Sequence, residues 1–274
     1  MPVRILFLTL LAASSLSACT TIAAPEQRRG TAESLAAARG WHLEPLPAGA
    51  LPLAAILPAA PARSDKLTIY IEGDGLAWIG SSRISPDPTP VDPLALRLAL
   101  AHPGGAAAYL GRPCQYVADS RCNAAYWTGR RFAPEVVSAT GQAVDLLKAR
   151  FGATRLTLVG YSGGAAVAML VAARRTDVAH VVTVAGNLDH KAWTSYHRVD
   201  PLTGSLNPAD DAVPVAQWHF VGQGDTVIPP RLVQAYAERF KGAARPMVQV
   251  VPGFDHHCCW AAAWPRLWND MESN

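Results

Sequence analysis

A serine framed by glycines is the first feature of the sequence that could do chemistry. Gly160-Tyr161-Ser162-Gly163-Gly164 follows an apolar run at 156–159 and precedes an alanine-rich stretch with helical character. A sharp strand-to-helix turn exposes a serine hydroxyl, and it requires glycines on both sides because side chains there would collide. The helix N-terminus behind such a turn favours negative charge that develops beside the serine. The segment therefore predicts a nucleophile at Ser162.

A serine hydroxyl needs a general base, and the base needs an orienting carboxylate, before the serine can attack at neutral pH. Asp225 and His256 each follow an apolar, strand-like run downstream of Ser162. Because the carboxyl ends of parallel strands meet at one edge of a sheet, we expect these three residues to converge there. His257 is a rival for the base and Asp189 for the carboxylate, since the sequence does not fix the register of a loop.

The elements that must position these residues alternate along the chain. Strand patterns occur at 41–43, 53–57, 67–71, 106–110, 155–160, 181–185, 217–222 and 247–251, and helical patterns at 93–101, 135–150, 164–175, 230–240 and from about 259. Strands that alternate with helices favour a mostly parallel central sheet flanked by helices. We therefore predict an α/β fold in which the irregular segment 187–214 is a small lid or loop insert.

Over roughly residues 41–272 the chain resembles the α/β-hydrolase superfamily of serine hydrolases. The matching motifs are the turn at 160–164, Gly222-Gln223-Gly224-Asp225 and Gly253-Phe254-Asp255-His256. The resemblance implies that Ser162 is the nucleophile, His256 the general base and acid, and Asp225 the carboxylate of a catalytic triad. It also implies carboxylesterase-like cleavage of a small-molecule or acyl-ester substrate through an acyl-enzyme, without a metal or an organic cofactor.

The same resemblance implies an oxyanion hole made of two backbone N–H groups. One belongs to Gly163, and we expect the second in the loop that follows the strand ending at Ile71, at Asp74 or else at Gly75. Glu72 departs from the family pattern, in which histidine is usual at this position. A carboxylate beside a developing oxyanion is unfavourable, so we expect Glu72 to point away or to be neutralised.

Composition supports a folded domain and excludes two classes of protein. The 274 residues are 50% hydrophobic and 16% charged, with 24 Lys and Arg against 21 Asp and Glu. This apolar content can bury a core, which excludes a disordered chain. A net charge of +3 without a cluster of basic residues excludes a nucleic-acid-coating surface. We predict a single α/β-hydrolase domain over residues 41–274.

The N-terminus has the pattern of a secretory signal. One positive charge precedes an apolar run at 5–13, which is shorter than the roughly 20 residues of a membrane-spanning helix. Leu16-Ser17-Ala18-Cys19 resembles the lipobox of bacterial lipoproteins. The resemblance implies a signal peptide over 1–18 and lipidation of Cys19.

Thr20, rather than aspartate, follows the cysteine. This resembles the outer-membrane sorting signal of Gram-negative bacteria, so we expect a protein of the bacterial cell envelope. Its membrane contact would be the lipid anchor on Cys19, at the outer membrane and facing the periplasm. Residues 19–40 are polar and rich in alanine, and we expect them to form a spacer without a core between lipid and domain.

Four further cysteines share the expected oxidising compartment. Cys114 and Cys122 are eight residues apart, and Cys258 and Cys259 are adjacent. Four cysteines allow three pairings. A local Cys114–Cys122 disulfide, with a vicinal bridge between the other two, is one of them, and crosswise pairings are the others. The sequence does not choose among them.

Two other functions are compatible with the sequence. A peptidase or thioesterase of the same fold would use the same serine. A non-catalytic envelope lipoprotein would keep the fold as a scaffold, but a scaffold has no need of a strained serine turn. The serine, aspartate and histidine together therefore favour a hydrolase.

Overall fold

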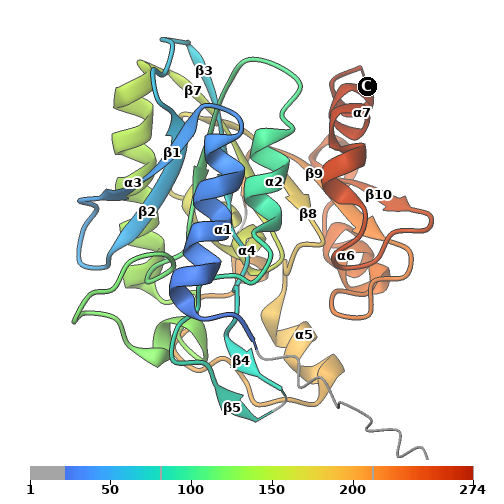
Figure 1. The fold of residues 1–274 in the computed structure, drawn as a ribbon. Coiled ribbons are helices and arrows are strands. Elements are labelled where there is room, and N and C mark those ends of the chain that lie inside the picture. Colours follow the sequence, from blue (N-terminus) through green and yellow to red (C-terminus); the bar gives the residue numbers. More distant parts are fainter. Residues whose placement is uncertain (1–21, 81, 212, 274) are drawn as a thin grey trace, which may run out of the picture.

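An eight-stranded sheet lies at the centre of the computed structural model, which describes residues 22–80, 82–211 and 213–273 (Figure 1). In order across the sheet, the strands are β1 (Trp41–Leu46), β2 (Leu53–Pro58), β6 (Ala106–Leu110), β3 (Lys66–Ile71), β7 (Arg155–Tyr161), β8 (Val178–Val184), β9 (Ala216–Gly222) and β10 (Met247–Val251). β2 runs antiparallel to its neighbours β1 and β6, and the other five strand pairs are parallel. The predicted mostly parallel sheet is confirmed.

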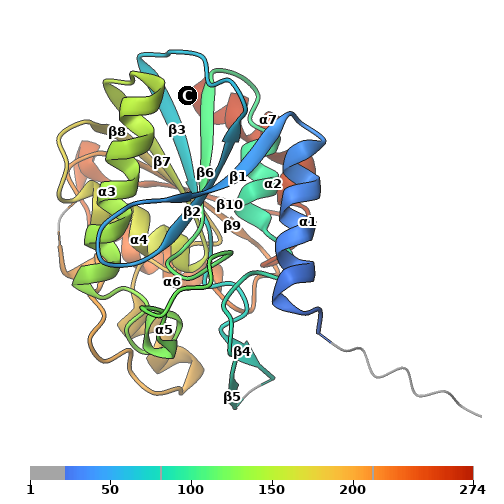
Figure 2. The same cartoon turned by 60° about the vertical axis from the view of Figure 1, so that its left-hand side comes forward.

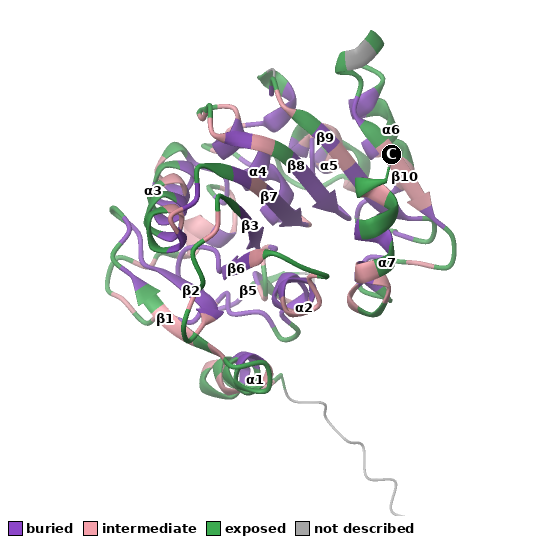
Figure 3. Ribbon diagram, turned by 90° about the horizontal axis from the view of Figure 1, so that it is seen from above, coloured by how far each residue is buried: buried purple, intermediate pink, exposed green. Residues whose placement is uncertain are grey.

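Successive residues of the central strands point to opposite faces of the sheet. On β3, Leu67, Ile69 and Ile71 join one apolar cluster, whereas Tyr70 joins the other. Because both faces are buried, the strand is apolar along its length, as a parallel strand between helices must be. Figure 3 shows this buried sheet between two layers of helices.

Helices cover both faces. The first face packs against α3 (Pro134–Phe151), α4 (Gly163–Ala172) and α6 (Pro230–Ala237), and the second against α1 (Pro25–Ala37), α2 (Leu94–Leu100) and α7 (Trp260–Glu272). Proline occupies the first turn of α1, α3 and α6, where its missing N–H costs no helical hydrogen bond. None of the helices within the described ranges is both long enough and apolar enough to cross a bilayer.

Helix α1 departs from the sequence prediction. Its side chains Ala32 and Ala36 are fully buried, and the buried guanidinium of Arg28 pairs with Asp87. The expectation of a spacer without a core is therefore wrong for residues 25–37. The buried stripe consists of alanines, whose small side chains give only a weak helical periodicity. The predicted signal peptide at 1–18, with Cys19 and Thr20, lies outside the described residues.

Smaller elements gather where the parallel strands end. β4 (Trp78–Ile79) and β5 (Arg83–Ile84) form a hairpin in the connection after β3, and α5 (His190–His197) lies in the predicted insert after β8. Both project from the same end of the sheet (Figures 1 and 2). Two short 3₁₀ turns lie at Ala124–Trp127 and Pro208–Asp210, and a third, Gly242–Ala244, lies at the opposite end, just before β10.

The four cysteines form two disulfides. Cys114 pairs with Cys122, with their Cα atoms 5.7 Å apart, and Cys258 pairs with its neighbour Cys259. Of the three pairings that the sequence allows, the structure contains the local one. The first disulfide closes the loop after β6, and the second follows His256.

Candidate active site

Ser162 stands between β7 and α4 on a turn with a left-handed backbone. Its φ is 51° and its ψ is −119°, a conformation that costs a non-glycine residue on the order of 1–3 kcal/mol. Gly164 packs against the carbonyl oxygens of Ile71 and Glu72, where any Cβ would collide. The turn therefore needs glycine beside the serine, as the sequence predicts.

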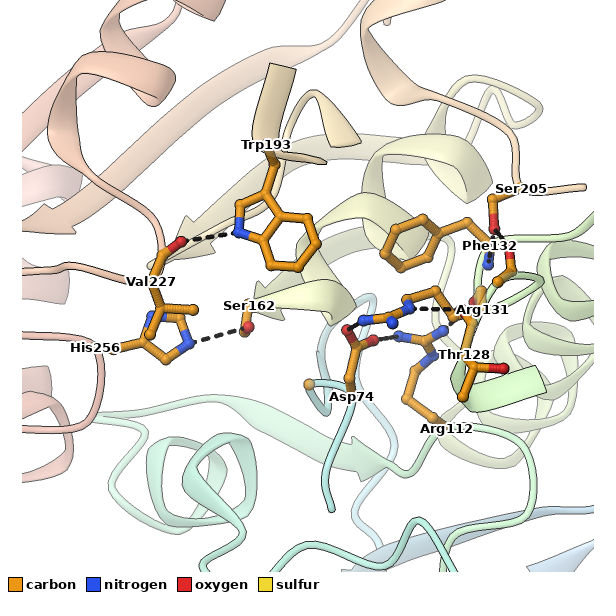
Figure 4. A network of polar contacts seen from close by, with 12 residues as sticks. Asp74, Arg112, Thr128, Arg131, Phe132, Ser162, Trp193, Ser205, Val227 and His256 are labelled. Carbon is orange, nitrogen blue, oxygen red and sulfur yellow. Dashed lines mark hydrogen bonds and ion pairs between the residues drawn. The ribbon is translucent and has the colours of Figure 1, made fainter. Parts of the chain in front are cut away.

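The structure brings Ser162, His256 and Asp225 together at the carboxyl end of the sheet. Ser162 Oγ lies 3.1 Å from His256 Nε2 (Figure 4), and His256 Nδ1 lies 2.9 Å from Asp225 Oδ2. The other carboxylate oxygen of Asp225 accepts the N–H groups of Val227 and Ile228 at 2.8 and 2.7 Å. Since a carboxylate only accepts, it keeps the imidazole proton on Nδ1 and leaves Nε2 to accept from the serine.

Tyr161 contacts both His256 and His257, but in different ways. Its ring packs on the His256 imidazole with centroids 5.3 Å apart, and its hydroxyl donates to the His256 carbonyl oxygen at 3.2 Å. His257 is exposed, and its Nδ1 lies 3.3 Å from the same hydroxyl. Of the two histidines, His256 is the one that contacts Ser162. The rival carboxylate, Asp189, instead caps the N-terminus of α5.

Asp74 lies beside the serine turn with two buried arginines. Its Oδ1 is 3.1 Å from Arg112 Nη1 and its Oδ2 is 2.6 Å from Arg131 Nη1 (Figure 4). Burial raises the pKa of the Asp74 carboxyl, but the two guanidinium groups outweigh burial and hold this pKa below its usual value. The carboxylate is therefore charged. The sequence does not predict either arginine as a partner of Asp74, because no local motif connects them with it.

The Asp74 carboxylate also packs against Gly163, where a Cβ would collide with it. This contact brings together the two residues expected to form the oxyanion hole. Gly163 is the first residue of α4, so its N–H has no acceptor within the helix. Gly75, the alternative donor, has a φ of 64° and packs against the carbonyl oxygen of Pro88.

Apart from the backbone of its neighbour Gly73, Glu72 is bonded to groups on α2 and β6. Its buried carboxyl group accepts the N–H of Gly73 at 2.9 Å, the N–H of Ala95 at 3.4 Å and the hydroxyl of Tyr109 at 3.1 Å. It therefore caps the N-terminus of α2. Burial raises the pKa of Glu72 to about 7, although these hydrogen bonds oppose the shift.

The stability of the protein should reveal the titration of Glu72. Between about pH 4.5 and 7 the folded state holds more protons on this raised-pKa carboxyl than the unfolded state, so the free energy of unfolding falls as the pH rises. Glu72→Gln removes this titration, and its Oε1 still accepts from the backbone. The free energy of unfolding of the wild type, relative to that of the variant, should fall by roughly 3 kcal/mol between pH 4 and pH 8. Urea denaturation of both proteins across this range measures the loss, and a constant difference would contradict it.

Helix α5 brings an aromatic side chain to the site through Trp193. The indole N–H donates to the carbonyl oxygen of Val227 at 2.8 Å, and Val227 belongs to the loop whose N–H groups hold Asp225. In Figure 4 the indole faces the space beside Ser162. Helix α5, within the predicted insert at 187–214, is therefore hydrogen-bonded to the loop that holds Asp225.

Comparisons with known proteins identify the fold. No protein-family model matches the sequence, and no curated protein is significantly similar to it in sequence. An α/β serine hydrolase homologue from Coxiella burnetii is 16% identical, with 85% of this chain and 96% of that chain aligned at a TM-score of 0.56. An esterase from Pyrococcus furiosus is 15% identical over 86% and 91% of the two chains, at a TM-score of 0.58. The chain has the α/β-hydrolase fold.

A third similar structure belongs to a serine hydrolase without a lid. It is an α/β serine hydrolase from Xanthomonas campestris, 15% identical over 84% of this chain and 94% of that chain, with a TM-score of 0.55. At these identities the similarity shows the α/β-hydrolase fold alone, and this fold hosts many chemistries. The function has to be inferred from the residues at the site.

Proposed function

We propose that the protein is a serine hydrolase that cleaves carboxylic esters. The observation that carries this proposal is the hydrogen-bonded series Ser162, His256 and Asp225, with distances of 3.1 and 2.9 Å, on a turn with a positive φ. A serine activated by a histidine, which is itself oriented by a carboxylate, is the arrangement that acyl transfer requires.

The geometry supports a reaction in two halves. Ser162 Oγ attacks the ester carbonyl carbon while its proton passes to His256 Nε2, and the N–H groups of Gly163 and Asp74 bind the oxyanion. His256 then donates the proton to the departing alcohol oxygen, which leaves an acyl group on Ser162. A water molecule then gives a proton to His256 Nε2 while its oxygen bonds to the acyl carbon. When the acyl carbon–Ser162 Oγ bond breaks, His256 returns the proton to Ser162 Oγ and the carboxylic acid leaves. Asp225 orients the imidazole and stabilises the imidazolium throughout.

The residues at the site do not by themselves select an ester over an amide, and we place esters first because one of the structural neighbours is named an esterase. Thioesters and amides would use the same residues. A series of esters of increasing acyl length, with matched thioester and amide analogues, separates these substrates by kcat/KM.

A fluorophosphonate probe tests the proposal most directly. The full chain and its Ser162→Ala variant are treated with the probe, and labelled residues are mapped by mass spectrometry. We expect labelling at Ser162 in the wild type and none in the variant, because the probe reacts with an activated serine. Ser195→Ala, at an exposed serine on α5, is the matched control and should still be labelled at Ser162. Folded, disulfide-oxidised protein without a label would instead favour the scaffold.

We also propose that the protein is a lipoprotein of the bacterial cell envelope, anchored through a lipid on Cys19. The lipobox-like residues 16–19, which follow a short apolar run, support this.

A further inference from the structure

Exposed apolar side chains are concentrated at the end of the molecule that carries Ser162. Nine large hydrophobic side chains are exposed among the residues that the structure describes, and of these only Leu146 and Met247 lie away from this end. Six others belong to the connections that follow β3, β8 and β9: Trp78, Ile84, Val91, Tyr196, Val199 and Val227. Single exposed hydrophobics are ordinary on protein surfaces, but a concentration at one end indicates an interaction face.

The hairpin β4–β5 has the composition of a segment at a membrane interface. Trp78 and Ile84 pair across the hairpin and are 40% and 43% exposed. Arg83, beside Ile84, is also exposed. Tryptophan partitions to the headgroup level of a bilayer, and arginine is attracted to anionic headgroups. The hairpin projects from the body of the domain in Figures 1 and 2, so a flat surface could reach it.

The first described residues lie at this same end. α1 leads into β1, which runs in the same direction as β6, so α1 must begin at the end where the parallel strands finish. Its Arg28 pairs with Asp87, in the connection that follows the hairpin. Figure 1 shows the start of α1 at this end, and Ile22, which is 46% exposed, comes three residues before it.

The proposed lipid attachment is close to this end. Cys19 is three residues before Ile22 and six before Pro25, which begins α1. Six extended residues span at most about 20 Å. Because α1 is packed into the core rather than forming a spacer, a lipid on Cys19 would hold this end of the domain against the bilayer, and the opposite end would face away.

We propose that the end of the domain that carries Ser162 is a docking face for a lipid bilayer. The apolar side chains of the hairpin and of the connections after β8 and β9 enter the headgroup region, next to the lipid on Cys19. The site then opens toward the membrane surface and receives substrates whose ester bond lies in that surface. This last statement rests on the proposed function, whereas the docking face does not.

Quenching of tryptophan fluorescence tests the docking face without using activity. The mature protein from Cys19, purified with its lipid, is reconstituted in vesicles of phosphatidylethanolamine and phosphatidylglycerol that contain phosphatidylcholine with brominated acyl chains. Trp78→Phe should remove at least half of the quenching by brominated lipid. Trp41→Phe is the matched control and should remove none, because Trp41 begins β1 at the opposite end. Equal quenching of the wild type and Trp78→Phe would overturn the proposal.

Two further results would also overturn it. One is an intact mass that shows no acyl chain on Cys19. The other is a dimer, detected by light scattering, that the Trp78→Ser substitution disrupts although it leaves the quenching by brominated lipid unchanged. A second copy of the chain, rather than a bilayer, would then cover this face.

A second measurement tests whether the docking face delivers membrane-embedded esters to the proposed active site. The Trp78→Ser, Ile84→Ser variant should lower the ratio of vesicle-embedded to water-soluble ester hydrolysis at least tenfold. Met247→Ser, at a side chain 54% exposed on the opposite end, should leave the ratio unchanged. If the wild type cleaves neither ester, the proposed function fails, while the quenching result still decides the docking face.

Discussion

Replacing His256 with alanine is expected to lower kcat for ester hydrolysis by at least about 10³-fold, because the serine loses the base that accepts its proton. His256 Nε2 lies 3.1 Å from Ser162 Oγ, and Asp225 and Tyr161 hold the imidazole from two sides. Steady-state kinetics with a water-soluble ester measures the loss. KM should change little, since the imidazole acts in the chemical step rather than in substrate binding.

His257→Ala is the matched control for this prediction. His257 is exposed and contacts the Tyr161 hydroxyl rather than Ser162. We expect its kcat to stay close to that of the wild type. A large loss in His257→Ala together with a small loss in His256→Ala would show that the loop adopts the other register in solution.

Asp74→Asn is expected to lower the free energy of unfolding by about 3–5 kcal/mol, because it leaves two buried guanidinium groups without a counter-charge. Arg112 and Arg131 are both buried, and each hydrogen-bonds one oxygen of the Asp74 carboxylate. An asparagine amide can accept from one of them but carries no charge to offset either. Urea denaturation at neutral pH measures the change.

An exposed ion pair provides the comparison for Asp74→Asn. Asp210→Asn removes the partner of Lys191, and both side chains are exposed, so the cost should stay below about 1 kcal/mol. If Asp74→Asn does not fold, Arg131→Met keeps the Asp74–Arg112 pair and should show a smaller loss. An Asp74→Asn variant as stable as Asp210→Asn would contradict the role of the buried cluster.

The parts of the fold and site that could be predicted are those with a local signal. The strands at 106–110 and 247–251 match β6 and β10 at both ends, because short apolar runs between turns define buried strands. Ser162, Asp225 and His256 each follow such a strand, and the parallel sheet brings strand ends to one edge. Their convergence therefore needed only the fold class and three local patterns.

The parts that could not be predicted depend on contacts between distant segments. Arg112 and Arg131 are 38 and 57 residues from Asp74 and lie in no motif. The choice between His256 and His257, in the loop after β10, depends on the packing of Tyr161, which ends β7. The sequence does not predict helix α1, because the side chains on its buried side are small. Asp87, which pairs with Arg28 of this helix, comes 59 residues further along the chain.

The packing of α1 redefines where the autonomous folding unit starts. A truncated protein that begins at Trp41, where the strand pattern starts, would uncover the apolar surface that Ala32 and Ala36 occupy. It would also leave the Asp87 carboxylate without its cation. Any shortened form for crystallisation or solution assays should therefore retain the chain from Ile22 onward, and a fusion partner belongs at the other terminus.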